Sequence, residues 1–188
     1  ELRPFMVILG LVSLLAGFNT VTQPFVIYYL GLTLDEWGLL YFLGSVIWIT
    51  ALLPAGAIVD RLGRRSSLIA GLFLTSLSLV ALSGLKSLGL TAFWHVAPSM
   101  LLLWTSSYLA HNALSALEAD LVPRGLRGRL SAFLALLTDV VAAVSSATCG
   151  WLYETVSPSA AALLCSLSAL AGAIMASLAL REPEERQG

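Results

Sequence analysis

Six long apolar stretches limit what this chain of 188 residues can fold into. They cover roughly residues 5–30, 38–59, 66–85, 92–118, 130–152 and 158–180. A helix needs about 20 mostly apolar residues to cross the hydrocarbon layer of a membrane, whereas a strand of a membrane barrel needs about 10 in an alternating pattern. Each stretch is continuously apolar, so we predict an all-α polytopic membrane protein, with one bundle of six transmembrane helices over residues 1–188.

The composition excludes several other classes of protein. Residues of the set AVILMFWYC make up 58% of the chain and charged residues 11%, whereas soluble domains are nearly half apolar and about a quarter charged. A net charge of -1 provides no basic surface for nucleic acid, and two cysteines are too few for a disulfide scaffold. The expected environment is therefore a lipid bilayer, with no nucleic acid as a partner.

The basic residues predict how the bundle is oriented. Nine of the ten Lys and Arg residues precede the first stretch or follow the second, fourth and sixth, and Lys86 lies on the other side. Cytoplasmic loops carry the excess of Lys and Arg, so both termini are predicted to be cytoplasmic. The expected location is the cell (inner, cytoplasmic) membrane.

The two cysteines fall in the last two stretches. Cys149 lies near the outer end of its stretch and Cys165 about two turns into the next, which predicts a difference in depth of roughly 8 Å. A disulfide requires sulfurs that meet, so both cysteines are interpreted as small, buried packing residues.

The loop after the second stretch carries the most specific pattern. Residues 56–65 read GAIVDRLGRR, or G-x-x-x-D-R-x-G-R-R. Gly56 allows a neighbouring helix to approach closely, and Gly63 allows a tight turn into the next helix. Asp60 is costly at a membrane edge unless it meets N–H groups or a cation. Three arginines with turn glycines also fit a loop that only anchors the topology.

A second pattern follows the fourth stretch, where residues 120–129 read DLVPRGLRGR, or D-x-x-P-x-x-x-R-G-R. Together the two loops resemble the signature loops of the major facilitator superfamily. The resemblance covers the whole chain but only one half of the twelve-helix unit of that family. It implies two inverted three-helix repeats and a second six-helix half as partner. The missing Met and the short polar end favour the carboxy-terminal half, although the signature loop is usually better kept in the amino-terminal half. A split transporter, or a half-size chain that pairs with itself, also fits.

The resemblance implies a role for each helix. In the family, the first and fourth helices of a half line a central cavity, the second and fifth face the other half, and the third and sixth form an outer scaffold. Polar residues of the fourth stretch fall within an arc of about 80°, and those of the first within about 100°, ahead of Pro24, which is expected to kink the helix. The expected cavity residues are Asn19, Thr20, Gln23, Trp104, Tyr108, His111 and Asn112. Hydrogen bonds between packed helices are the alternative role for these side chains.

Two ionisable residues are candidates for proton coupling. Asp139 lies about ten residues into the fifth stretch, which places its carboxyl near the bilayer midplane, where it needs water or a partner. His111 carries an imidazole, which titrates near neutral pH. A polar contact to the other half is the alternative for Asp139, and a hydrogen bond within the bundle is the alternative for His111.

The resemblance also implies a cytoplasmic gate. Asp60 would lie at the positive end of a helix in the partner half, and Arg61 or Arg64 would pair with Asp120, with Glu118 as a further partner. A static anchor of the topology is the alternative. The expected gate residues are Gly56, Asp60, Arg61, Gly63, Arg64, Arg65, Glu118, Asp120, Pro123, Arg127 and Gly128.

These observations predict a transporter and not an enzyme. The chain has no G-x-S-x-G sequence and no Walker loop, and both histidines lie in the fourth stretch, so no metal or cofactor is expected. We expect one half of a secondary active transporter that moves a small molecule by alternating access, with proton coupling as an option. A half-size chain that homodimerises, or a sensor or assembly subunit of the same fold that does not transport, is the alternative.

Overall fold

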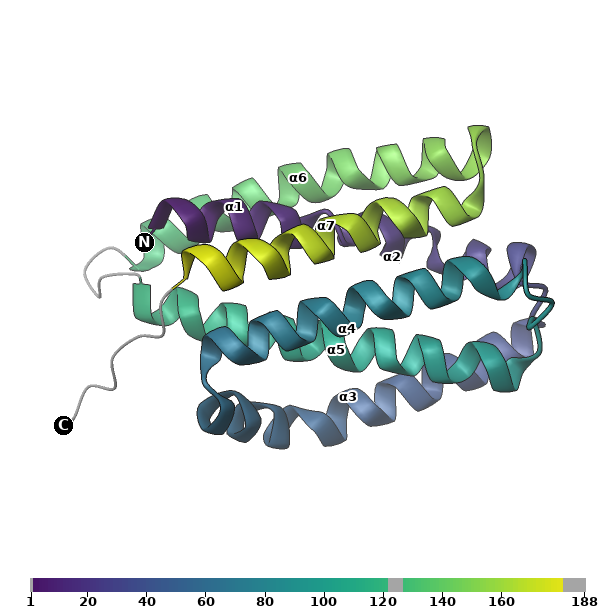
Figure 1. Ribbon diagram of the computed structural model, residues 1–188, viewed down its shortest axis with the longest axis horizontal. Helices are drawn as coiled ribbons and strands as arrows, with labels where there is room; N and C mark the ends of the chain where they lie inside the picture. Colours follow the sequence, from purple (N-terminus) through teal and green to yellow (C-terminus); the bar gives the residue numbers. More distant parts are fainter. Residues whose placement is uncertain (1, 122–126, 181–188) are drawn as a thin grey trace.

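The computed structural model describes residues 2–121 and 127–180, with the side chains of all of these except residues 2, 51–55 and 127. The described residues form helices and no strand, which confirms the all-α prediction (Figure 1). In order these are α1 (Leu2–Ser13), α2 (Ala16–Pro24), the π-helix η1 (Phe25–Tyr29), α3 (Leu34–Leu62), α4 (Arg64–Leu85), α5 (Phe93–Leu121), α6 (Arg127–Thr155) and α7 (Pro158–Ala179).

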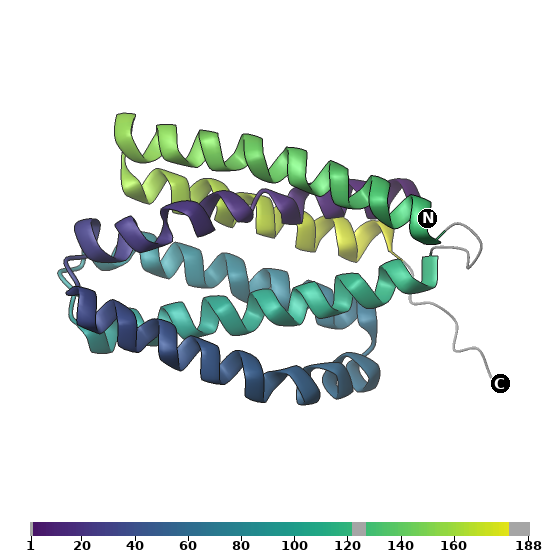
Figure 2. The ribbon, with the colours of Figure 1, turned by 180° about the vertical axis from the view of Figure 1, so that it is seen from behind.

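The helices run lengthwise in an elongated bundle. The start of α1, the turn between α3 and α4, the end of α5 and the end of α7 lie at one end, as Figures 1 and 2 show from opposite sides. The links from η1 to α3, from α4 to α5 and from α6 to α7 lie at the other end. Successive helices therefore run in opposite directions, with α1, α2 and η1 acting together as one pass.

Four helical stretches of the described chain are both long and apolar enough to cross a membrane. They are Arg3–Tyr29, Arg64–Leu85, Gly128–Thr155 and Pro158–Ala179. The helices α3 and α5 each have 29 residues but are not among the four. Polar residues run along α5, and residues 51–55 of α3 have side chains outside the described set. The arrangement of six spans as two inverted repeats stays a prediction.

The first helix is irregular at two points. Pro24 ends α2 and a π-helical turn follows it, so the irregularity begins where the proline predicts a kink. A second break lies at Leu14 and Leu15, and neither residue is a Pro or a Gly that would predict it. There the backbone N–H of Leu15 donates to the carbonyl of Val12 (3.0 Å), and that of Gly17 donates to the carbonyl of Leu14 (3.2 Å). Both bonds span three residues, as in a 3₁₀-helix, in place of the four of an α-helix.

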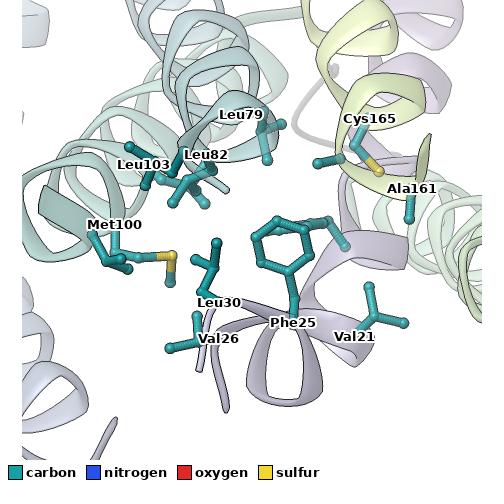
Figure 3. Close-up of a cluster of buried hydrophobic side chains, with 14 of the residues drawn as sticks. Val21, Phe25, Val26, Leu30, Leu79, Leu82, Met100, Leu103, Ala161 and Cys165 are labelled. Atoms are coloured by element: carbon teal, nitrogen blue, oxygen red, sulfur yellow. The ribbon is translucent and has the colours of Figure 1, made fainter. Parts of the chain in front are cut away.

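The centre of the bundle is formed by α4, which packs against both α5 and α7. Close approach requires small residues, and a Cβ atom on Gly71 would lie 2.7 Å from the backbone nitrogen of Ala110 in α5. Two buried apolar clusters fill the two halves of the bundle. Figure 3 shows the cluster nearer the turn between α4 and α5, where Phe25 lies among Leu79, Leu82 and Met100.

The expected difference in depth between the two cysteines is wrong. Both are buried, and their sulfurs lie 3.6 Å apart. The apolar stretch that ends near residue 152 underestimates the helix, because α6 continues to Thr155 before α7 begins at Pro158. Cys149 and Cys165 therefore lie at nearly equal distances from the link between α6 and α7. Their interpretation as buried residues is confirmed.

Candidate functional site

A cavity of about 1050 Å³ lies between the first helical pass and α5. Residues of α1 and α2 form one wall, and a stripe of α5 from Leu103 to Glu118 forms the opposite wall. Thr75 and Leu79 of α4 also line it, as do residues of α3 and α6. Pockets of roughly 300–1,000 Å³ hold drug-sized ligands, so this space is large enough for a small molecule.

Six of the seven expected cavity residues line this space. They are Asn19, Thr20 and Gln23 of α2, and Trp104, Tyr108 and His111 of α5. Asn112 is half-buried and is not among the lining residues. Ser115 and Glu118, further along the same face of α5, line the cavity as well. Whether these side chains bind a substrate stays a prediction.

Aromatic rings from two helices meet at one part of the cavity wall. The ring centroids of Trp37 and Tyr41 in α3 lie 6.3 and 6.2 Å from that of Trp104, and 6.1 Å from each other. Gly44 makes room for Trp104, because a Cβ atom there would lie 2.3 Å from the indole ring. Sequence reasoning missed Trp37 and Tyr41, although their spacing of four places both on one face of a helix.

The helix α4, which is the third pass of the chain through the bundle, contributes to the cavity. This differs from the outer-scaffold role that the resemblance implies for it. The hydroxyl of Thr75 in α4 hydrogen-bonds with the hydroxyls of Ser106 (2.9 Å) and Ser107 (3.4 Å) in α5. Ser107 and Thr75 both line the cavity. Thr75 itself is fully buried, so the half-buried Ser107 is the member of this hydroxyl network that faces the cavity.

Asp139 lies beside the cavity and not in its wall. Ser131, Leu134, Ala135 and Thr138 present one face of α6 to the cavity. Asp139 is exposed and follows Thr138, so its side chain lies about 100° further round the helix. This position is on the flank of α6, beside its cavity face.

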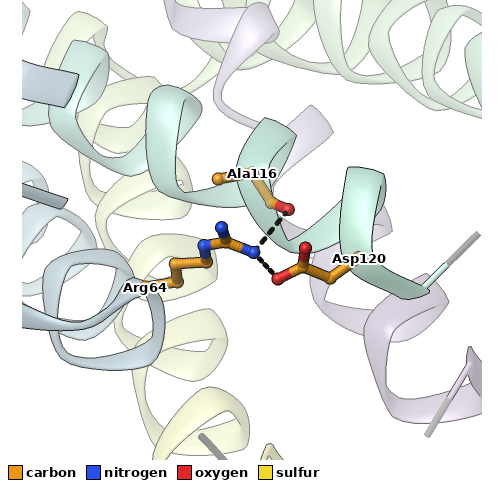
Figure 4. A network of polar contacts seen from close by, with 3 residues as sticks. All are labelled: Arg64, Ala116 and Asp120. Carbon is orange, nitrogen blue, oxygen red and sulfur yellow. Dashed lines mark hydrogen bonds and ion pairs between the residues drawn. The ribbon is translucent and has the colours of Figure 1, made fainter. Parts of the chain in front are cut away.

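At the end of the bundle that holds the start of α1, the expected pair between a signature arginine and Asp120 is present. Arg64 forms an ion pair with Asp120, and the same nitrogen donates to the carbonyl of Ala116 (3.5 Å), as Figure 4 shows. Glu118 does not share this pair. It accepts a hydrogen bond from Ser131 Oγ (2.8 Å), which joins α5 to α6 beside the cavity.

Arg65 of the same motif contacts α7. Its guanidinium donates to the carbonyl of Ala176 (3.4 Å) and to that of Ser177. These carbonyls belong to the last turn of α7, where the carbonyl of Ala176 also accepts from the backbone N–H of Leu180 (3.3 Å). Arg64 and Arg65 therefore attach the start of α4 to the ends of two other helices, which is a structural role whether or not a gate operates here.

The glycines of the signature loop differ in their surroundings. Gly63 is the single residue between α3 and α4 and has a φ of 87°, which confirms the expected tight turn. Gly56 is exposed with no atom within 4 Å of an added Cβ, so the expected close approach of a helix does not occur among the described residues. Asp60 and Arg61 are exposed near the same turn.

The second motif is described only in part. Pro123 lies outside the described residues, and so does the side chain of Arg127. Gly128 is exposed in the first turn of α6, with open space around it. Among the described residues, no group of three or more His, Cys, Asp or Glu side chains could hold a metal ion.

The comparison with protein families decides what kind of protein this is. A family model described as Major Facilitator Superfamily matches residues 5–188. The chain belongs to the major facilitator superfamily. Members of this superfamily are transporters, and together with the apolar helices the match indicates a membrane protein. A search of curated proteins found no match.

Proposed function

We propose that this chain is one six-helix half of a secondary active transporter, which moves a small molecule across the cytoplasmic membrane by alternating access. The observation that carries the proposal is the cavity between the first pass and α5. Its wall combines amide and hydroxyl groups of α2 with the aromatic and polar stripe of α5. Polar faces of this kind are costly against lipid and are expected where helices border water or a ligand.

The open side of the cavity calls for a second six-helix half. Large apolar side chains are exposed along α6, on the side of the helix turned away from its cavity face: Phe133, Leu136, Val140 and Val144. The start of α3 exposes Leu39, Tyr41 and Phe42 in the same way. The other half of the same transporter would cover these faces, and another copy of the chain is the alternative. In this arrangement both termini are cytoplasmic.

The charges of the cavity wall favour an uncharged or cationic substrate. Among the described lining residues, Glu118 is the one with a carboxyl group, and no Lys or Arg is present. A strongly anionic molecule would meet no cation other than a protonated His111. The rings of Trp37, Tyr41 and Trp104 offer stacking surfaces for a planar or cationic group.

Proton coupling would use His111 and Asp139. His111 lines the cavity, so a proton on its imidazole would face the same space as the substrate. Asp139 is exposed on the flank of α6 that the second half would cover. A proton that moves between such groups as the halves rock would link its passage to that of the substrate.

The ion pair of Arg64 and Asp120 would form part of the cytoplasmic gate. It joins the start of α4 to the end of α5, while Glu118 and Ser131 join α5 to α6. Both contacts lie near the end of the cavity where the two motifs meet. Asp60 and Arg61 are exposed there and available to the second half. Breaking this set would open the cavity toward the cytoplasm.

The test is uptake by the complete gene product in proteoliposomes, with a panel of sugars, amino acids and drugs and a pH-sensitive dye inside. Trp104→Ala is expected to lower the uptake of the substrate found by about tenfold, because it removes a ring from the cavity wall. Trp94→Ala is the matched control, since Trp94 is 80% exposed at the far end of the same helix.

The same experiment separates the alternatives. No uptake of any compound by the wild-type protein would favour a sensor or assembly subunit that keeps the fold without transporting. Equal losses for Trp104→Ala and Trp94→Ala would contradict the cavity as the substrate site. Uptake by this chain alone, reconstituted without a second half, would indicate a homodimer.

A further inference from the structure

Two free cysteines on neighbouring helices have no role in the proposed transport. Cys149 of α6 and Cys165 of α7 are both fully buried, and their sulfur atoms lie 3.6 Å apart. Such a contact is close to the arrangement that a disulfide needs, in which the sulfurs are about 2.05 Å apart. The helices α6 and α7 are joined by a short link, so their relative position at this depth is well defined.

The pair lies directly behind the break in the first helix. The Cys165 thiol donates to the carbonyl oxygen of Leu14 (3.4 Å), which also accepts from Ser145 Oγ (2.6 Å). Gly17 fits against the same place, because a Cβ atom there would lie 2.7 Å from the sulfur of Cys149. The neighbouring residues Leu15 and Ala16 line the cavity. The cysteines therefore contact one side of the segment of residues 14–17, and another side of the same segment lines the candidate site.

We propose that Cys149 and Cys165 are a modification site that forms a disulfide between α6 and α7. Both S–H bonds break and one S–S bond forms, while two electrons and two protons pass to a membrane-permeant acceptor of the diazene or quinone class. A diazene is thereby reduced to a hydrazine, or a quinone to a quinol. The sulfurs need to close by about 1.5 Å in total, or about 0.8 Å each.

The disulfide would act on a helix of which the rest of the chain buries little. Only 11% of the apolar stretch of α6 is buried, against 50% for α7. A covalent link ties α6 to the well-packed helix at the depth of the break. Oxidation also removes the thiol donor from Leu14, whose carbonyl keeps the hydroxyl of Ser145 and the backbone N–H of Gly17.

The test uses the purified full chain, treated with diamide or with dithiothreitol and then alkylated, digested without reduction and analysed by mass spectrometry. After diamide, we expect a cross-linked pair of peptides that contain Cys149 and Cys165, two hydrogen masses below the sum of the reduced peptides. The thermal unfolding temperature should rise by about 5 to 10 °C, because the link closes a loop of about 15 residues and so lowers the entropy of the unfolded chain. Dithiothreitol should reverse both changes.

The variants Cys149→Ser and Cys165→Ser are the controls, and each should lose both the cross-link and the rise in unfolding temperature. Recovery of both thiols in alkylated form after diamide would overturn the proposal. Cross-links between two chains in place of the link within one chain would overturn it as well. The wild-type protein alone decides the outcome, so a variant that fails to fold does not affect the test.

Discussion

The helices α4, α7 and α6 are similarly apolar. They differ sharply in how much of each helix the rest of the chain buries. Half of the apolar stretch of α4, and half of that of α7, is buried inside the structure, whereas the share for α6 is 11%. All three are long enough to cross a membrane. Apolar content therefore decides that a helix lies in the bilayer and does not decide whether it is packed against protein.

Small residues and polar contacts explain the difference better than hydrophobicity does. Lipid tails are as apolar as Leu side chains, so helices in a membrane associate through close packing and hydrogen bonds. On α4, Gly71 meets the backbone of Ala110, and the hydroxyl of Ser76 hydrogen-bonds with that of Ser166 in α7 (2.9 Å). On α6, Gly150 has open space around it. The packed pair is the fixed frame, whereas α6 contacts the rest of the chain along one side, at residues such as Ser145 and Cys149, and leaves its other side exposed to another partner.

The largest effect is expected when a methyl group is added to a glycine in each region. Gly71→Ala would place its Cβ 2.7 Å from the backbone nitrogen of Ala110, so α4 and α5 must separate. We expect a loss of about 2 kcal/mol in the free energy of unfolding, measured by denaturant titration in detergent. Gly150→Ala on α6 is the matched control and should be neutral or slightly stabilising, because alanine favours the helix. Equal losses at the two positions would contradict the contrast between the regions.

A smaller effect is expected when a hydroxyl is replaced by a methyl group. Thr75 is fully buried and hydrogen-bonds across to Ser106 of α5, so Thr75→Val should cost about 1 kcal/mol. Thr148 of α6 donates only to the carbonyl of Val144 in its own helix (2.8 Å), and Thr148→Val should change stability by much less. The same titration measures both variants. A larger loss for Thr148→Val would show that α6 carries contacts comparable to those of α4.

The regular part of the fold could be predicted from the sequence because it depends on local pattern. Runs of apolar residues, with Thr33 and Glu36 as a capping box before α3, mark where helices lie. The break at Leu14 and Leu15 could not be predicted, since the groups that contact it, such as Ser145, come from distant helices. The depth of the cysteines was misjudged for a related reason, because apolarity marks the membrane span and not the end of the helix.

The candidate site was predictable to the extent that it lies on one helix. The stripe from Trp104 to Glu118 follows helical spacing and lines the cavity as a unit. Trp37 and Thr75 reach the same space from helices whose sequences show no polar stripe, and only the packing of α3 and α4 against α5 brings them there. The pairing of Arg64 with Asp120 came from the family resemblance, which carries information on contacts between helices that spacing alone lacks.

The central claim is that the cavity between α2 and α5 is a water-accessible path for substrate. The most direct measurement is labelling by a membrane-impermeant maleimide in the complete gene product, in a background of Cys149→Ser and Cys165→Ser. Thr20→Cys, on the cavity wall, should react from the water on at least one side of the membrane, and substrate should slow it. Leu167→Cys, 64% exposed on α7, should face lipid and react at least about tenfold more slowly, because the thiolate forms in water. No reaction of Thr20→Cys from either side would contradict the account.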